Sequence, residues 1–313
     1  MSGGNGVSGL GLVRRLAKLP FPYSAPSVPA GVEPLARKSR SGPDYDTDWA
    51  RRYPARLVRA ALLEAVTRPA VAALADPERR GLDRLDVLDP DDGPVIFAAN
   101  HHSHLDTPVL VTSIPEPWRH RLFVVGAADY FFRTPVTSAL SALVIGAVPM
   151  ERTGIGRRSA DRAAALIDQG WSMLIFPEGG RSPDGWGQPF RGGAAYLAVR
   201  GGVPVVPVHL LGTGRILPKG RKVPRPATVK VTFGSPLRPA EGASTRRFAA
   251  TIERAVAELA DEATTDWWTA RRRAHNGTTP PLTGPDAPGW RRAWALGDPS
   301  RKRRRQRRRW PEL

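Results

Sequence analysis

The stretch "VIFAANHHSHLDTPVL" (95–110) places a polar cluster between two apolar runs. The first run, 95–99, is short and continuously apolar, which is typical of a strand covered on both faces of a sheet. After the polar cluster, Thr107 and Pro108 suit the first turn of a helix. A buried strand that turns directly into a helix is the repeating unit of an α/β fold.

The surrounding chain continues this alternation. Further covered strands are predicted at 122–125, 172–176 and 203–208. "TVKVTF" (228–233) alternates instead and suits an edge strand. Helices are predicted over 56–75 with a kink at Pro69, over 159–170 with Ser159 as its cap, and over 244–263. We therefore expect an α/β domain with a mixed, mostly parallel β-sheet flanked by helices.

Composition divides the chain into three parts. Residues 1–48 are rich in Gly, Pro and Ser and predict a disordered N-terminal tail, whereas 49–264 should form the folded domain. Residues 265–313 are expected to form a Trp-containing, basic C-terminal tail, also disordered. Within it, "RKRRRQRRR" (301–309) holds eight basic residues in nine positions and should repel itself.

Charge and cysteine content limit the function. The 313 residues carry a formal net charge of +18, which favours an anionic partner such as a membrane surface or nucleic acid. We do not expect nucleic acid, because the core shows no recognition motif or pattern of stacking aromatic residues. The absence of cysteine excludes disulfides, zinc–thiolate sites and thiol nucleophiles.

The histidine cluster at 101–106 allows two chemical interpretations. His102, His104 and Asp106 alternate as in the metal-binding signature of metallo-β-lactamase-type hydrolases. Alternatively, His101 pairs with Asp106 as an acid–base dyad, which requires the chain to turn through 101–105 and to enter a helix near Asp106. A regular helix would hold these two residues about 140° apart. A third possibility is that Asp106 only caps the helix.

A second polar stretch, "LIFPEGGRSPDG" (174–185), follows another predicted strand. Its glycines and Arg181 would let backbone amides and a guanidinium converge on an anion. It could equally be an ordinary turn that contains a salt bridge between Glu178 and Arg181.

Together, four motifs resemble the glycerolipid acyltransferase family, of the 1-acyl-sn-glycerol-3-phosphate acyltransferase type. "NHHSHLD" (100–106) matches its N-H-x4-D motif, and "FPEGGRS" (176–182) matches F-P-E-G-T-R-S, with Gly180 in place of Thr. "GAVPMER" (146–152) and "VPVVPV" (203–208) match the intervening and last motifs. The resemblance covers about residues 85–235 and follows the family's order.

The resemblance implies an O-acyltransferase in which His101 is the general base and Asp106 orients it. It implies that Arg152 and Arg181 grip the acceptor phosphate. Its other implied positions are Glu178, Gly179 and Gly180 for substrate binding and Asn100, Phe176, Pro177 and Pro207 for support.

The implied co-substrates are acyl-CoA or acyl carrier protein, with no metal and no further cofactor. The implied acceptor is a lysophospholipid, first of all 1-acylglycerol-3-phosphate, which would give phosphatidic acid. Another glycerolipid or a glycolipid remains an alternative acceptor. A covalent acyl-enzyme is not expected, because the chain has no G-x-S-x-G elbow and no cysteine.

The sequence contains no apolar run of about 20 residues that would span a bilayer. Its first residues also lack the order of charge and apolar run that a signal peptide has. We expect a cytoplasmic protein that is peripheral at the inner face of the cell membrane, with the basic tail attracted to anionic lipid.

Overall fold

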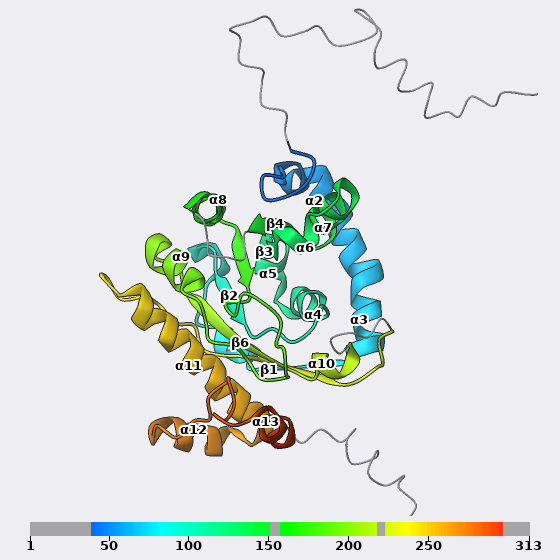
Figure 1. The fold of residues 1–313 in the computed structure, drawn as a ribbon. Helices are drawn as coiled ribbons and strands as arrows, with labels where there is room; N and C mark the ends of the chain where they lie inside the picture. The colour runs from blue at the N-terminus through cyan, green and yellow to red at the C-terminus, as the bar shows by residue number, and fades with distance from the viewer. Residues whose placement is uncertain (1–38, 151–156, 218–222, 297–313) are drawn as a thin grey trace, which may run out of the picture. The chain divides into compact units, whose positions relative to one another are not determined.

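A computed structural model of the protein describes residues 39–150, 157–217 and 223–296 (Figure 1). Its centre is a seven-stranded sheet with the order β1-β7-β6-β2-β5-β3-β4. The strands are β1 (Pro77–Arg80), β2 (Ile96–Ala99), β3 (Leu122–Ala127), β4 (Ala147–Met150), β5 (Ser172–Ile175), β6 (Val205–Leu211) and β7 (Val229–Phe233). β6 pairs with β7 antiparallel and every other named pair is parallel, so the predicted mixed, mostly parallel sheet is confirmed.

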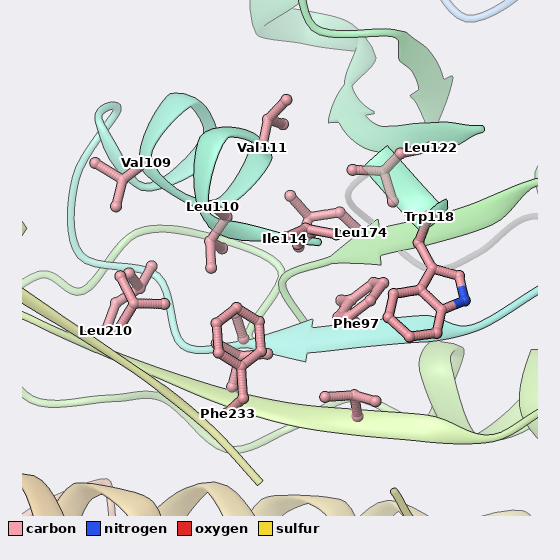
Figure 2. Packing of buried hydrophobic residues seen from close by; sticks show 14 of the residues in the cluster. Phe97, Val109, Leu110, Val111, Ile114, Trp118, Leu122, Leu174, Leu210 and Phe233 are labelled. Carbon is pink, nitrogen blue, oxygen red and sulfur yellow. The ribbon is translucent and has the colours of Figure 1, made fainter. Parts of the chain in front are cut away.

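Helices cover both faces of this sheet because side chains alternate along each strand. On β2, Phe97 faces one hydrophobic cluster, shared with α3 (Arg68–Ala75) and α4 (Asp106–Ser113) (Figure 2). Ile96 and Ala98 face the opposite cluster, which includes residues of α8 (Arg157–Asp168), α9 (Gly193–Gly201) and α11 (Thr245–Thr264). Strands covered on both faces account for the continuous apolar runs in the sequence.

The predicted strands are confirmed, but the expectation that 228–233 is an edge strand is wrong. β7 lies between β6 and β1, and β1 is the outer strand. β1 has the sequence "PERR" and is largely exposed, so it has no apolar pattern to reveal it. It pairs with β7 through backbone groups, with Pro77 opposite Val229. β4 was not predicted as a strand either.

The predicted helices are confirmed with two refinements. The 56–75 helix divides into α2 (Tyr53–Leu62) and α3, joined by the π-helical turn η2 (Leu63–Thr67) directly before Pro69. Proline has no N–H to continue the helical ladder, so the break falls there. Ser159 lies inside α8 and is not its cap, whereas Gly170, with φ of 81°, follows its end as expected.

Regular structure continues past Thr264, where composition had predicted a tail. α12 (Trp267–His275) and α13 (Gly289–Ala295) lie there. The remaining short elements are η1 (Asp48–Arg51), η3 (Leu82–Leu85), η4 (Pro90–Asp92), α5 (Glu116–Arg119), α6 (Ala128–Phe131), α7 (Pro135–Val144) and α10 (Thr213–Ile216). Within the three described ranges, no helix is both long and apolar enough to cross a bilayer. The basic run 301–309 lies outside the described residues.

Candidate active site

The polar cluster at 100–106 is the turn between central strand β2 and helix α4. β2 ends at Ala99 and α4 begins at Asp106, so the chain turns through 101–105 as the acid–base interpretation requires. His101 Nδ1 lies 2.8 Å from Asp106 Oδ2. The pairing of these two side chains, one of the alternatives left open by the sequence, is therefore present in the structure.

The same carboxylate oxygen of Asp106 organises the turn. Oδ2 also accepts the backbone N–H groups of His102 at 2.6 Å and Ser103 at 2.8 Å. The Asp106 side chain is completely buried. Three donors converging on one buried carboxylate oxygen compensate for its loss of water. Asp106 thus shapes the turn and holds the imidazole at the same time.

The His101 ring is oriented by a second contact. It stacks on Phe176, with ring centroids 4.2 Å apart and an interplanar angle of 20°. If Nδ1 carries the proton that Asp106 accepts, Nε2 keeps a lone pair. The side chain is 17% exposed and lines a cavity.

Asn100 attaches the start of the turn to the sheet. Its side-chain amide donates to Leu210 O at 2.9 Å and accepts from Leu210 N at 2.7 Å. These two bonds extend the β2–β6 pairing by one step beyond Ala99 and Val208. Asn100 therefore positions the residue that follows it, His101, without lining the cavity itself.

The loop that follows β5, residues 178–188, is joined to the His101 turn. Glu178 Oε1 accepts His101 N–H at 2.9 Å, and Oε2 accepts Gln188 N–H at 3.0 Å. Ser182 N–H donates to His101 O at 2.9 Å. Both polar backbone groups of His101 are therefore held by the neighbouring loop, here called loop 178–188.

Glu178 is buried and binds backbone amides. Burial raises the pKa of its carboxyl from 4.5 to about 7, against the two N–H donors, which lower it. Glu178 and Arg181 are both described, and no ion pair joins them. The salt-bridge alternative is therefore wrong, and Glu178 instead orders the two loops.

A cavity of about 860 Å³ opens beside His101. It lies where the carboxyl ends of β3, β4 and β5 meet, the position where open α/β sheets place their sites. Part of its wall is apolar and comprises Val124, Val125, Ala127, Phe131, Met150, Ala160 and Ile175. The polar part comprises His101, Arg181, Arg191 and the glycines Gly179, Gly180, Gly192 and Gly193.

The predicted site residues fall into four groups. His101, Phe176, Pro177, Gly179, Gly180 and Arg181 line the cavity. Asp106, Glu178 and Asn100 lie behind it as partners of the turn. Pro207 lies within β6 opposite Ala98 and does not line the cavity. Arg152 lies outside the described residues.

The metal interpretation gains no support from the geometry. Among the described residues, no three His, Asp or Glu side chains gather closely enough to hold an ion. His104 stacks on Tyr130 with ring centroids 4.7 Å apart, and His102 is half-buried. Burial is also the main reason that the pKa of His102 is lowered.

Several cavity residues were not predicted from the sequence. Arg191 lines it from the segment before α9, Tyr196 from α9 and Thr245 from α11. Gln188, which was not predicted either, does not line the cavity but contacts residues that do. Gln188 donates from Nε2 to Arg181 O at 3.1 Å and to Gly180 O at 3.3 Å. The stretch "PFRGG" (189–193), a basic residue and two glycines before a helix, is a signal that could have identified Arg191.

Comparisons with known proteins show which proteins this chain is similar to. Residues 79–211 match the family model described as Acyltransferase. The chain is 36% identical over 139 residues to "1-acyl-sn-glycerol-3-phosphate acyltransferase BAT2, chloroplastic" of Brassica napus, covering 44% of this chain and 38% of that protein. It is 30% identical over 130 residues to the human "1-acyl-sn-glycerol-3-phosphate acyltransferase beta", covering 40% and 45%. The chain thus spans less than half the length of these two relatives.

A solved structure shares the fold. The crystal structure of the 1-acyl-sn-glycerophosphate acyltransferase PlsC from Thermotoga maritima is similar with a TM-score of 0.55 and 26% sequence identity. The similarity covers 71% of this chain and 84% of that one.

Proposed function

We propose that this chain, whose residues 79–211 form an acyltransferase-family domain, transfers an acyl group from a thioester to the hydroxyl of a lysophospholipid. One observation carries the proposal: the imidazole of His101, held by Asp106 at 2.8 Å, faces a cavity that also contains the guanidinium-bearing Arg181. A base and an anion-binding side chain in one cavity suit a substrate that has both a hydroxyl and a phosphate.

In the proposed reaction, His101 Nε2 takes the proton of the acceptor hydroxyl as its oxygen attacks the thioester carbonyl. The resulting tetrahedral intermediate collapses, the C–S bond breaks, and the leaving thiolate receives the proton from the imidazolium. Asp106 keeps the ring in the required tautomer and stabilises its positive charge. The products are the acylated acceptor and the free thiol of CoA or acyl carrier protein.

Direct transfer is favoured over a covalent acyl-enzyme. Ser103 is the hydroxyl nearest to the dyad in the sequence, but its side chain is buried and donates to Leu217 O at 3.3 Å. It does not line the cavity. The chain contains no cysteine that could replace it.

The acceptor phosphate would bind at the polar end of the cavity. Arg181 and Arg191 both line this end, and arginine suits phosphate by its forked geometry and permanent charge. Gly192 and Gly193 bring the amino end of α9 to the same wall, where backbone N–H groups favour an anion. We propose 1-acylglycerol-3-phosphate as the acceptor, in keeping with the names of the relatives.

The acyl chain of the thioester donor would lie along the apolar wall. The cavity volume of about 860 Å³ is within the range of roughly 300–1,000 Å³ typical of ligand sites. Met150 and Phe131, at the ends of β4 and α6, contribute to this apolar surface. The cavity therefore offers charged side chains for the acceptor phosphate and apolar side chains for the acyl chain of the donor.

An anionic membrane surface is the proposed source of the acceptor. Helix α2 exposes Tyr53, Leu57 and Val58, and α7 exposes Val136 and Leu140. Trp267, Trp268 and Trp290 are exposed as well, and indole rings favour the interface between lipid and water. Together with the net charge of +18, these side chains support a peripheral location at the inner face of the membrane.

The test is to incubate purified protein with labelled palmitoyl-CoA and matched acceptors, and to identify the product. We expect phosphatidic acid from 1-acylglycerol-3-phosphate and little product from 1-acylglycerol, which lacks the phosphate. Substitution Arg181→Lys should raise the acceptor KM and leave the donor KM unchanged. Equal rates with both acceptors would contradict the assignment of the polar end of the cavity.

A further inference from the structure

Residues 282–296, here called the clasp, contact residues 184–187 of loop 178–188. Gly187 N–H donates to Leu282 O at 3.0 Å, and Trp186 Nε1–H donates to Arg292 O at 3.1 Å. Arg292 Nε lies 2.8 Å from Asp184 Oδ2. The clasp follows α12 and lies outside residues 79–211, which match the family model.

Close packing accompanies these polar contacts. Gly284 has φ of +73° and lies so near the Trp186 indole that a Cβ there would overlap the ring. A Cβ on Gly185, which has φ of +96°, would come within 2.8 Å of Leu296 Cδ1. One on Gly187 would lie 3.2 Å from Leu282. Each side of this contact therefore has a glycine where the other side approaches most closely.

A series of hydrogen bonds connects the clasp with residues that line the cavity. Gly187, bonded to Leu282, is followed by Gln188, whose N–H binds Glu178 and whose side chain binds the carbonyls of Gly180 and Arg181. The position of Gln188 therefore determines where these two carbonyls lie. Because Arg181 and Gly180 line the polar end of the cavity, displacement at Gly187 would be transmitted to the anion-binding wall.

We propose that the clasp is a positioning element for acceptor binding: by holding Trp186 and Gly187, it keeps loop 178–188 in the conformation that presents Arg181 to the acceptor phosphate. The proposal rests on the proposed function for the identity of the ligand. It assigns Trp186, Gly284 and Arg292 roles that act through the loop and involve no contact with substrate. Donor binding, at the apolar wall, is independent of the clasp.

The decisive comparison uses two glycines of the C-terminal region. Gly284 and Gly277 have φ of +73° and +67°, so alanine imposes similar backbone strain at both. At Gly277 nothing lies within 4 Å of the added Cβ, whereas at Gly284 it meets Trp186. Any difference between Gly284→Ala and Gly277→Ala therefore reports the contact with Trp186.

In the full chain, Gly284→Ala should raise the acceptor KM by about tenfold, a loss of about 1.4 kcal/mol, while the donor KM stays unchanged. Gly277→Ala should keep the wild-type KM values for both substrates. Hydrogen–deuterium exchange without substrate should be faster in 179–188 for Gly284→Ala alone. Equal KM values and equal exchange in the two variants would overturn the proposal.

A second, milder pair of variants tests the proposal if Gly284→Ala does not fold. Trp186→Phe removes the indole N–H but keeps a ring, and should raise the acceptor KM by about threefold. Trp49→Phe, at a half-buried indole whose N–H makes no hydrogen bond within the described residues, is its control and should leave the acceptor KM unchanged. Should wild type acylate no lysophospholipid, the proposed function fails, and the exchange comparison still decides whether the clasp orders the loop.

Discussion

The two loops that form the site are built in different ways. The turn at 100–106 is organised from within, because Asp106 Oδ2 binds His101, His102 and Ser103, all within five residues. Loop 178–188 has internal hydrogen bonds from Gln188, but it also depends on partners far along the chain. Glu178 binds His101, 77 residues away, and Trp186 binds Arg292, 106 residues away.

This difference separates two kinds of function. A proton transfer needs the imidazole in one tautomer and one orientation, and a short-range network supplies both with few partners. Acceptor binding needs several groups around a phosphate, and these come from separate parts of the chain. We therefore expect changes in the turn to lower kcat, and changes in loop 178–188 to act on acceptor KM and on stability.

The largest effect is expected at His101. Substitution His101→Ala removes the proposed base and should lower kcat by about 10²–10⁴-fold, the usual contribution of general-base assistance. Steady-state rates with saturating palmitoyl-CoA and 1-acylglycerol-3-phosphate provide the measurement. Activity within a few-fold of wild type would exclude His101 as the base and remove the contrast between the two loops.

Asp106→Asn should lower kcat by about a hundredfold, because a neutral amide no longer stabilises the imidazolium. The amide NH₂ would replace Oδ1, which is buried and has no hydrogen-bond partner among the described residues. An unsatisfied buried donor costs about 1–3 kcal/mol, so urea unfolding should show a loss of that size. Unchanged stability would mean that the buried surroundings of Oδ1 accommodate the added donor.

Glu178→Gln should change how stability depends on pH. Between pH 4.5 and about 7, folded wild type holds a proton that the unfolded chain has released, so its stability falls as pH rises. The loss is at most about 3 kcal/mol, and the variant lacks it. Urea unfolding at pH 5 and pH 8 tests this, with Glu241→Gln on the exposed surface as control. Parallel pH profiles for wild type and Glu178→Gln would refute the assignment.

The smallest effect compares two adjacent glycines of loop 178–188. Gly179 has φ of +72°, and a Cβ would lie 2.8 Å from Arg191 Nε, so Gly179→Ala should destabilise the protein by about 1–3 kcal/mol. It should also raise the acceptor KM by displacing Arg191. At Gly180 the nearest atom is 3.9 Å away, and Gly180→Ala should stay within about 0.5 kcal/mol of wild type. Equal losses at both positions would show that the loop, rather than the individual glycine, is sensitive.

The space at Gly180 also bears on the sequence. The resembling family has threonine there, and the structure leaves room for a Cβ, so this departure removes a hydroxyl without signalling a different loop conformation. The replacement of threonine by Gly180 is therefore compatible with the loop conformation seen here.

The sequence by itself determined the strands of the sheet centre and the turn at 100–106. Continuous apolar runs identify covered strands, because burial on both faces leaves no polar position. The spacing allowed the His101–Asp106 pair as one of three interpretations, and the structure contains that contact. These features are formed by residues that lie close together in the sequence, so a local pattern of residues can indicate them.

Tertiary structure alone decided the outer strand β1, the role of Glu178 and the place of the clasp. The exposed charged residues of β1 carry no apolar pattern, because its pairing with β7 uses backbone groups that every residue has. Glu178 and Trp186 have partners on distant parts of the chain, His101 and Arg292, which only the packing of the fold brings near. Contacts between residues about 100 positions apart depend on how layers pack, and no local pattern of residues encodes that packing.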